Sequence, residues 1–430
     1  MISVHDLRGG RPYPAERWRA AGGAPAKVRA TVADILAAVH EEGDAALRRL
    51  TGELDGYSGP VAEVSRDACK SAVDALDPAL RSALERATDQ VRWFHERARP
   101  ADWSDRRDGA VMGVRHSPLR RVGAYVPGGL APLVSTAVMT IVPARVAGVD
   151  EVVLASPPDA DGRIPAAILA AAEIAGGADR VFALGGAQAV AAMAYGTASV
   201  PRCDKVVGPG NAYVAEAKQQ VAAAGACGID LLAGTTEVAI IADHSADPRH
   251  VAADLVAQAE HDPLAVAILI TPDPGLVERV IDALAVEVAA TRHAERIRTA
   301  LIGQGAAVLV DNLEHAVAVA DAFAAEHLEV QTLDAHSVAD RVRAAGAIFV
   351  GAHTPVSLGD YAAGPNHTLP TGGTARFAGG LRTDDFLVPI NWVSYDAETL
   401  AAFAPVVDAL GAAEDLPAHA RAVRIRLEGR

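Results

Sequence analysis

Two side chains able to bind a metal ion stand three residues apart near the end of a predicted helix. Asp247 and Pro248 are typical of a helix start, and Pro263 marks the end of the segment. Positions three apart lie on one side of a helix, so Gln258 and His261 can reach a common ion. The alternative is that the two side chains only satisfy each other's hydrogen bonds. Further candidate residues elsewhere in the chain favour the metal.

A second pair of neighbouring residues, Glu326 and His327, is suited to proton transfer. The pair closes a predicted helix and precedes a strand-like run at residues 328–330. A carboxylate beside an imidazole supplies two general bases, and the imidazole titrates near neutral pH. The alternative is a histidine that only interacts favourably with a helix C-terminus.

Asp360 and His419 add an oxygen and a nitrogen to the metal-binding candidates. Together with Gln258 and His261 they form an N/O set without a thiolate, which suits zinc and also other divalent ions. Because Asp360 and His419 lie far along the chain from the first pair, their spacing alone leaves the site open.

Three glycine-containing loops follow strand-like runs, at residues 125–129, 185–188 and 208–211. Glycine lets the backbone approach a ligand closely, and the last two loops lead into predicted helices whose N-termini suit phosphate. Gln188 and Asn211 stand in these loops and can hydrogen-bond a ribose or an amide. The loops match neither GxGxxG nor the P-loop, and each alone is also typical of an ordinary turn. Together they favour a nucleotide site.

The composition favours a cytoplasmic enzyme. The chain has 430 residues, of which 50% are hydrophobic and 4% aromatic, and its net charge of −15 argues against a surface for nucleic acid or anionic membrane. The N-terminus lacks a signal-peptide pattern, and no apolar stretch is long enough to span a bilayer. Three widely spaced cysteines fit a reducing compartment better than a disulfide framework.

The order of the predicted elements indicates an α/β protein with two incomplete Rossmann-like doubly wound units, a helical N-terminal region and a small helical C-terminal tail. From Arg121 onwards, short apolar runs alternate with Ala-rich helical stretches, which predicts mainly parallel sheets with sites beyond the carboxyl ends of their strands. The expected parts are an N-terminal arm (1–24), a first α/β domain (25–124 plus 236–381), a second α/β domain (125–235) and the tail (382–430).

Motifs along nearly the whole chain resemble those of the histidinol dehydrogenase family. The resemblance runs from about Leu7 to the end, in order and without a large gap. It rests on Ala-Gly-Thr-Thr-Glu at 233–237, Gln-Ala-Glu-His at 258–261, Ala-Glu-His-Leu at 325–328, Gly-Asp-Tyr at 359–361, Gly-Pro-Asn-His-Thr-Leu-Pro-Thr at 364–371, and Glu414 with Ala-His at 418–419. That family oxidises L-histidinol to L-histidine in two NAD-dependent steps through an aldehyde.

The resemblance implies a role for each candidate residue. It implies one zinc ion per subunit, with ligands Gln258, His261, Asp360 and, from the other subunit of a domain-swapped homodimer, His419. The substrate L-histidinol would meet these ligands and also Thr236, His327, His367 and Glu414. NAD would lie near Tyr125, Gln188 and Asn211. The resemblance further implies that His327 takes the alcohol proton and that Glu326 activates water for attack on the aldehyde, and that the C-terminal tail packs on the partner subunit.

Two departures from the family pattern leave a related substrate open. Thr235 stands where the family loop has proline, so the loop loses a restraint and gains a donor. Residues 387–392 also depart from the basic segment usual there. Neither change touches a ligand or a base, and a paralogue that oxidises another polar amino alcohol or hydroxy compound is therefore the alternative function.

Two other interpretations of the sequence, a non-catalytic protein and a cysteine-based mechanism, are disfavoured. A non-catalytic binding protein has no physical need for both Glu326 and His327. A thiohemiacetal on Cys203 or Cys227 would need a thiol in an activated setting, and neither sequence context provides one.

Overall fold

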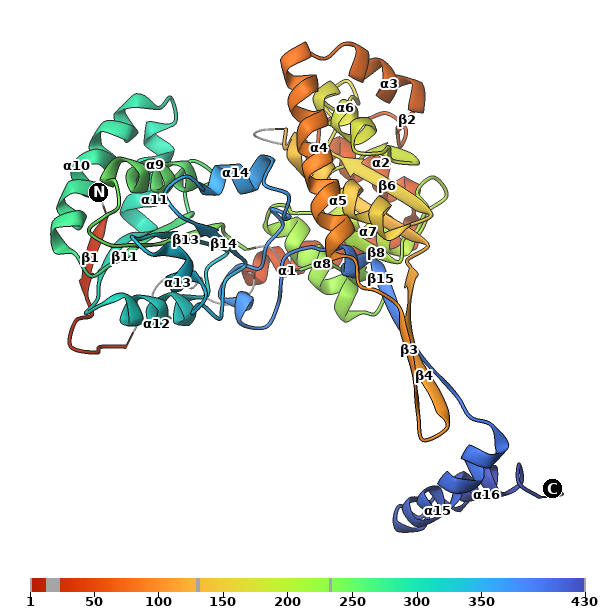
Figure 1. Ribbon diagram of the computed structural model, residues 1–430. Helices are drawn as coiled ribbons and strands as arrows, with labels where there is room; N and C mark the ends of the chain where they lie inside the picture. The colour runs from red at the N-terminus through yellow and green to blue at the C-terminus, as the bar shows by residue number, and fades with distance from the viewer. Residues whose placement is uncertain (1, 13–23, 129–131, 232–233, 429–430) are drawn as a thin grey trace. The chain divides into compact units, whose positions relative to one another are not determined.

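Figure 1 shows the computed structural model of the chain, which describes residues 2–12, 24–128, 132–231 and 234–428. Gly129 and Ala233, which belong to two of the motifs named above, lie outside the described residues. The chain forms two compact units, residues 1–98 with 119–386, and residues 99–118 with 387–430. No helix among the described residues is long and apolar enough to cross a membrane.

The first unit contains a six-stranded parallel sheet, called here the β10 sheet, with the order β1-β12-β11-β10-β13-β14. Its strands are β1 (Ser3–Asp6), β10 (Glu237–Ala242), β11 (Val266–Thr271), β12 (Gly305–Leu309), β13 (His327–Gln331) and β14 (Ala347–Val350). Its helices are α9 (Pro248–Ala259), α10 (Pro274–Ala290), α11 (Ala294–Gln304), α12 (Leu313–Phe323), α13 (Ala335–Ala339) and α14 (Val356–Tyr361).

Both faces of the β10 sheet are buried under helices. Side chains alternate along a strand, so Ile240 packs with α9, α10 and α11 while its neighbour Ile241 packs with α12 and α13. Continuous burial on two faces explains why the inner strands β10, β11 and β12 are almost wholly apolar in sequence. The α9 helix begins as predicted, because Asp247 accepts a hydrogen bond from the backbone N–H of Arg249 and Pro248 takes the first helical position.

The first unit also contains a second six-stranded sheet, called here the β5 sheet, with the order β2-β7-β6-β5-β8-β9. Its strands are β2 (Glu63–Val64), β5 (Arg121–Tyr125), β6 (Glu151–Ser156), β7 (Arg180–Ala183), β8 (Lys205–Val207) and β9 (Gly228–Ile229), and β2 alone in this sheet runs antiparallel. Its helices are α1 (Ala26–Glu42), α2 (Asp44–Leu54), α3 (Arg66–Asp74), α4 (Pro78–Ala98), α5 (Val134–Ala147), α6 (Ala166–Ile174), α7 (Gly186–Tyr195) and α8 (Ala212–Ala223).

The strand order reverses at one point in each sheet. β10 lies between β11 and β13, and β5 lies between β6 and β8, so each sheet has the doubly wound arrangement of a Rossmann-like unit. The predicted fold class, two incomplete Rossmann-like units with an added helical region, is therefore confirmed.

The grouping of the N-terminal helices differs from the expectation. Residues 25–124 were expected with 236–381, but Val32 and Val39 of α1 share a core with Val190 of α7 and Val221 of α8. Strand β5 likewise pairs with β6 and β8. Periodicity identifies the apolar face of a helix and not the sheet that this face covers. The sequence alone therefore could not assign α1 to the β5 sheet or to the β10 sheet. The expected N-terminal arm also contributes β1 to the edge of the β10 sheet.

The second unit is an antiparallel sheet of order β15-β4-β3 followed by two helices. Its elements are β3 (Trp103–Arg107), β4 (Ala110–Pro118), β15 (Leu387–Ser394), α15 (Ala397–Ala413) and α16 (Pro417–Arg424). The tail was expected to be helical from residue 382, and here the structure differs. The run 387–394 is a strand because it carries β-branched and aromatic residues, and Pro389 is tolerated since β15 is an edge strand.

Candidate functional site

The two predicted bases, Glu326 and His327, lie near the amino ends of β10 and β13. Three further predicted site residues, Thr236, Gln258 and His261, lie at the same edge of the sheet. Glu326 and His327 stand at the start of β13, and Thr236 directly precedes β10. Helix α9 connects two parallel strands and therefore runs back towards their amino ends, which returns Gln258 and His261 to this edge. The expectation of a site beyond the carboxyl ends of the strands does not hold for the β10 sheet.

A chain of short hydrogen bonds connects α9 to Glu326. Nε2 of Gln258 donates to Oγ1 of Thr236 across 2.6 Å, and that hydroxyl donates in turn to Oε2 of Glu326 across 2.6 Å. The same carboxylate oxygen accepts from the backbone N–H of Glu237 at 2.9 Å. Oε1 of Gln258 is buried and has no hydrogen-bond partner among the described residues. Such an atom is costly to bury, and an oxygen of this kind is a ligand for a divalent cation.

His261 and Asp360 face each other beside this chain. Nε2 of His261 lies 3.7 Å from Oδ2 of Asp360, which belongs to α14. Hydrogen bonding and the charge of Asp360 raise the pKa of His261, although burial opposes the shift. Burial acts to raise the pKa of Asp360, but its interactions with His261 and the other nearby histidines outweigh burial and lower it. Asp360 is therefore held as a carboxylate, the form that binds a cation.

No three His, Cys, Asp or Glu side chains gather into a metal-binding group among the described residues. The first unit does contain the amide of Gln258 and the pair His261 and Asp360, which are three of the four predicted ligands. The fourth, His419, lies on α16 of the second unit and is exposed, as is Glu414 at the end of α15.

The hydrogen bonding of His327 leaves one ring nitrogen available as a base. Nδ1 lies 3.1 Å from the backbone oxygen of Glu237, which can only accept, so Nδ1 carries the hydrogen when the ring is neutral. Nε2 is then the basic atom, and it lies 3.9 Å from Oδ1 of Asp360. Burial raises the pKa of the neighbouring Glu326, although the charge of His327 and two hydrogen bonds oppose the shift.

A cavity of about 200 Å³ opens beside His327. It is lined by His327, Ala347, Ile348, Phe349, Thr354, Gly359, Ala363, Pro365, Asn366, His367 and Leu369. Burial lowers the pKa of His367 to about 4, so its imidazole is neutral at neutral pH. Gly359 must lack a side chain, since a Cβ there would lie 2.5 Å from the ring of Phe349. The cavity is thus largely apolar, with two imidazoles in its wall.

Part of this cavity wall is fixed to α5. Nδ2 of Asn366 donates to the backbone oxygen of Met139 across 2.6 Å, and Nε2 of His367 lies 3.4 Å from Oγ1 of Thr136. The end of the same motif closes on the loop before β10, where Thr371 accepts a hydrogen bond from the backbone N–H of Gly234 at 2.6 Å. The segment 364–371 therefore joins the cavity to the loop that carries Thr236.

The predicted nucleotide-binding residues lie at the carboxyl ends of the β5 sheet, as expected for a Rossmann-like unit. Tyr125 ends β5, and its hydroxyl accepts from the backbone N–H of Gly186 at 3.1 Å. Burial raises the pKa of Tyr125 to about 12, which keeps the phenol protonated. Asn211 caps α8 by accepting from two backbone N–H groups.

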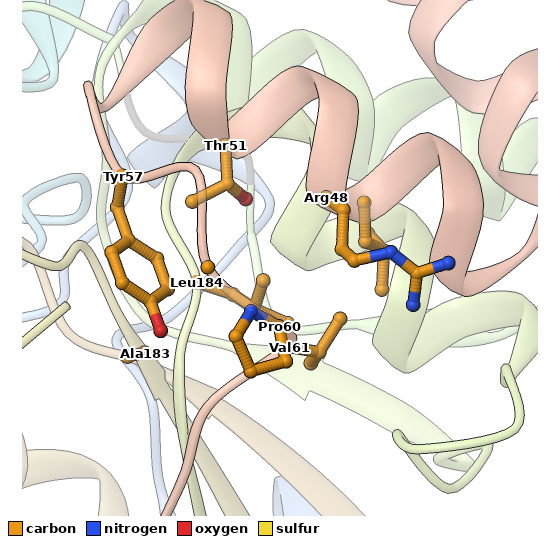
Figure 2. A pocket seen from close by; sticks show the side chains of 9 residues that line it. Arg48, Thr51, Tyr57, Pro60, Val61, Ala183 and Leu184 are labelled. Carbon is orange, nitrogen blue, oxygen red and sulfur yellow. The ribbon is translucent and has the colours of Figure 1, made fainter.

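Gln188 is held by a residue that the sequence analysis missed. Nε2 of Gln188 donates to Oδ2 of Asp55 across 3.0 Å, while Oε1 is buried without a hydrogen-bond partner among the described residues. Asp55 ends the α2 helix and carries no motif, so sequence offered no signal for it. Figure 2 shows a small hollow lined by side chains of α2, of residues 57–61 and of the end of β7, and Asp55 lies between the first two of these segments in the sequence. The hollow leaves no space for a water-sized molecule.

Two further polar residues at the site edge were also missed. Glu237 orients His327 through its backbone oxygen, and its Oε1 accepts from the backbone N–H of Gly372 at 3.0 Å. Glu329 is a buried carboxyl in β13, next to apolar neighbours. A carboxyl is rarely buried unless it is paired, so Glu329 between the apolar residues Leu328 and Val330 is a signal that sequence reasoning can use.

Comparison with known proteins gives a consistent result. The family model described as histidinol dehydrogenase matches residues 20–427. Histidinol dehydrogenases of Nocardia farcinica and Thermus thermophilus are 47% and 48% identical; the alignments cover 98% and 93% of this chain and 97% and 94% of theirs. The crystal structure of histidinol dehydrogenase from Elizabethkingia anophelis superposes with a TM-score of 0.93 at 31% identity, covering 99% of this chain and 98% of that one. The chain therefore belongs to the histidinol dehydrogenase family.

Proposed function

We propose that the chain is a cytoplasmic, zinc- and NAD-dependent L-histidinol dehydrogenase that oxidises L-histidinol to L-histidine through L-histidinal. The observation that carries the proposal is the arrangement of His327. Its Nδ1 is occupied by a backbone carbonyl, and its Nε2 faces Asp360 at the wall of the cavity. An imidazole whose Nδ1 is held by a carbonyl and whose Nε2 lies at a cavity wall is suited to accept the proton of an alcohol at Nε2.

The proposed metal ligands are Gln258, His261 and Asp360, with His419 as the fourth. The residues of the first unit fit a cation, because Oε1 of Gln258 is buried without a partner and Asp360 is held as a carboxylate. Zinc, when bound, supplies a Lewis acid that orients and polarises the polar groups of the substrate.

The two bases would act in sequence. In the first oxidation His327 accepts the hydroxyl proton of the alcohol, and the carbon gives up a hydride. In the second, Glu326 removes a proton from water as its oxygen bonds to the aldehyde carbon, which gives the hydrate as its anion. This anion loses a hydride to give the carboxylic acid, and the acid releases a proton to become the carboxylate. Burial favours such a base, because it raises the pKa of Glu326 towards the working pH.

NAD, when bound, accepts these hydrides, two molecules being reduced for each L-histidinol. The proposed contacts are Tyr125, Gln188 and Asn211, at the point where the strand order of the β5 sheet reverses. The free Oε1 of Gln188 and the protonated hydroxyl of Tyr125 supply one acceptor and one donor there. We further propose that Thr236, His367 and Glu414 line the histidinol side of the site.

The proposed assembly is a homodimer in which the second unit packs on the partner subunit. This unit exposes large apolar side chains on β15, on α15 and just after α16, at Val393, Val406, Leu410 and Ile425. Large exposed apolar residues on one small unit favour a protein interface. In such a dimer His419 and Glu414 would complete the partner's site.

Thr235 favours a second candidate, a paralogue acting on another polar amino alcohol, because it adjoins Thr236 and stands where the family has proline. Purified protein supplied with zinc, NAD and either L-histidinol or a second amino alcohol separates the two. Release of L-histidine from L-histidinol is expected. Turnover of the second alcohol alone would contradict the substrate and support the paralogue.

A further inference from the structure

A polar stripe runs along the face of β13 that α9 and α14 cover. Because side chains alternate along a strand, His327, Glu329 and Gln331 point to the same face of the β10 sheet. Their partners in register on β10 are Val238, Ile240 and Ala242, all of which pack in the core under α9. The His327 end of this stripe belongs to the site described above. The two other members have no role in the proposed chemistry.

Glu329 is bound by groups from two other elements. Its Oε1 accepts from the backbone N–H of Val356, the first residue of α14, at 2.8 Å. Its Oε2 accepts from Nε2 of Gln331 at 2.8 Å, and the same amide nitrogen donates to Oδ2 of Asp254 on α9 at 2.8 Å. The side chain of Glu329 is 1% exposed. One buried cluster therefore joins β13, α9 and α14.

The three elements that meet at this cluster are the ones that carry the site of the first unit. Asp254 lies one helical turn before Gln258, on the same side of α9. Val356 lies one turn before Asp360 in α14. The position of Asp360 relative to α9 is thus set by a contact that begins at Glu329.

The cluster contains two carboxyl groups and no cation bound to either. No lysine or arginine among the described residues pairs with Asp254 or Glu329. The surrounding groups are Gln331 on β13, the Val356 N–H on α14, and His250 on α9, whose charge acts on Asp254. Burial, and then the charge and hydrogen bond of Asp254, raise the pKa of Glu329, and burial raises that of Asp254. Oxygens of both carboxyls lie 2.8 Å from one nitrogen, Nε2 of Gln331, and two carboxylates held this close in a buried site repel each other unless one carries a proton.

We propose that Asp254 and Glu329 share one proton, so that one of the two carboxyls is neutral and the other ionised. This pair is a positioning cluster that holds α14, and with it Asp360, against α9, the helix that carries Gln258 and directly precedes His261. Only the test by zinc affinity rests on the proposed function, because it requires the proposed zinc site. Because the pKa of Glu329 is raised above that of an exposed carboxyl, the contribution of the shared proton is complete below the pH at which an exposed carboxyl ionises and is lost as the pH rises through the raised pKa.

The shared proton has a direct spectroscopic test. The infrared spectrum of the wild-type protein near neutral pH should contain the carbonyl stretch of a protonated carboxylic acid, and this band should be missing from Glu329→Gln. That variant keeps the shape of Glu329, and its amide can donate to an ionised Asp254 in place of the shared proton. A wild-type spectrum with no band that depends on Glu329 or Asp254 would overturn the proposal.

The positioning role is tested with two substitutions of one residue. Glu329→Gln should bind zinc within about threefold of wild type, and Glu329→Ala should bind about 10- to 100-fold more weakly, as is typical when support of a ligand is lost. The amide of Val356 should exchange hydrogen faster in Glu329→Ala only. Asp243→Ala is the control, because the Asp243 side chain accepts three hydrogen bonds just beyond the carboxyl end of β10, and none of their donors belongs to the cluster of Asp254, Glu329 and Gln331.

Equal zinc affinity and equal Val356 exchange in Glu329→Ala and Glu329→Gln would overturn the positioning role. An equal loss of zinc affinity in Asp243→Ala would overturn it as well, since the effect would then be a general loss of stability. If wild-type protein bound no zinc, the proposed function would fail, whereas the infrared band and the Val356 exchange rate would still decide the present inference.

Discussion

The amide of Gln258 donates a hydrogen bond to Oγ1 of Thr236 across 2.6 Å and leaves its own Oε1 buried without a partner among the described residues. The alternative that Gln258 and His261 only satisfy each other therefore loses its basis, because the ring of His261 faces Asp360 instead. The hydrogen-bond chain from Gln258 through Thr236 to Glu326 also couples a proposed ligand to a proposed base.

Removal of the imidazole of His327 should slow the alcohol oxidation strongly. In His327→Asn the amide can still donate to the backbone oxygen of Glu237, so the fold is kept while the basic Nε2 is lost. We expect kcat to fall by about 10²- to 10⁴-fold, the usual contribution of a positioned base. Steady-state kinetics with L-histidinol measure the effect, and the exposed His336→Asn is the control. Full activity of His327→Asn would refute the assigned role.

Loss of His261 should remove the metal. The variant His261→Asn keeps a polar side chain but loses the ring nitrogen that faces Asp360. We expect zinc affinity to fall by more than the roughly 100-fold that changes behind a ligand can cause. Elemental analysis after dialysis gives the zinc content. His244→Asn, an exposed change in the loop before α9, should retain it, and undiminished zinc in His261→Asn would count against the proposed ligand.

Truncation of Gln188 should weaken NAD binding without changing the affinity for the alcohol. Gln188→Ala removes the free Oε1 and also the hydrogen bond to Asp55. Loss of about one hydrogen bond to the cofactor should raise KM for NAD by roughly three- to tenfold, with KM for L-histidinol unchanged. Gln220→Ala on α8 is a matched control. A change in both KM values, or in neither, would argue against a cofactor contact.

Neither Cys203, which is buried, nor the half-buried Cys227 should take part in the reaction. Burial raises the pKa of Cys227 to about 11 and raises that of Cys203 further, so both remain protonated and weakly nucleophilic at neutral pH. The variants Cys203→Ala and Cys227→Ala should keep the wild-type kcat, at a cost of about 1 kcal/mol in the free energy of unfolding. Thermal unfolding and steady-state kinetics test both points. Loss of only the aldehyde step in either variant would revive the thiohemiacetal route.

Local patterns predicted the elements of the fold well, since capping and periodicity are properties of short segments. The helix ending near Gln258 begins at Pro248 as its Asp-Pro start indicates, and the apolar runs of the two halves form parallel strands. Which sheet or helix an apolar face packs against depends on the fold of the whole chain. Periodicity therefore could not tell that α1 covers the β5 sheet, or that residues 387–394 pair with β4.

The candidate site was only partly accessible from sequence for a similar reason. Motifs identified side chains with chemistry, such as Glu326 and His327, but not the edge of the sheet at which they lie. That edge follows from the direction of α9, which returns to the amino ends of the strands. Asp55 follows a helix and Asp254 lies within one, both as ordinary carboxylates in sequence, and their roles appear only from their partners Gln188 and Gln331.

The most direct test of the proposed function is the number of NADH molecules formed for each L-histidinol consumed by the purified, zinc-supplied protein. One active site with two successive bases predicts two NADH for each L-histidinol, with L-histidine as the final product. One NADH with release of the aldehyde would contradict the second step assigned to Glu326, and none would contradict the function as a whole.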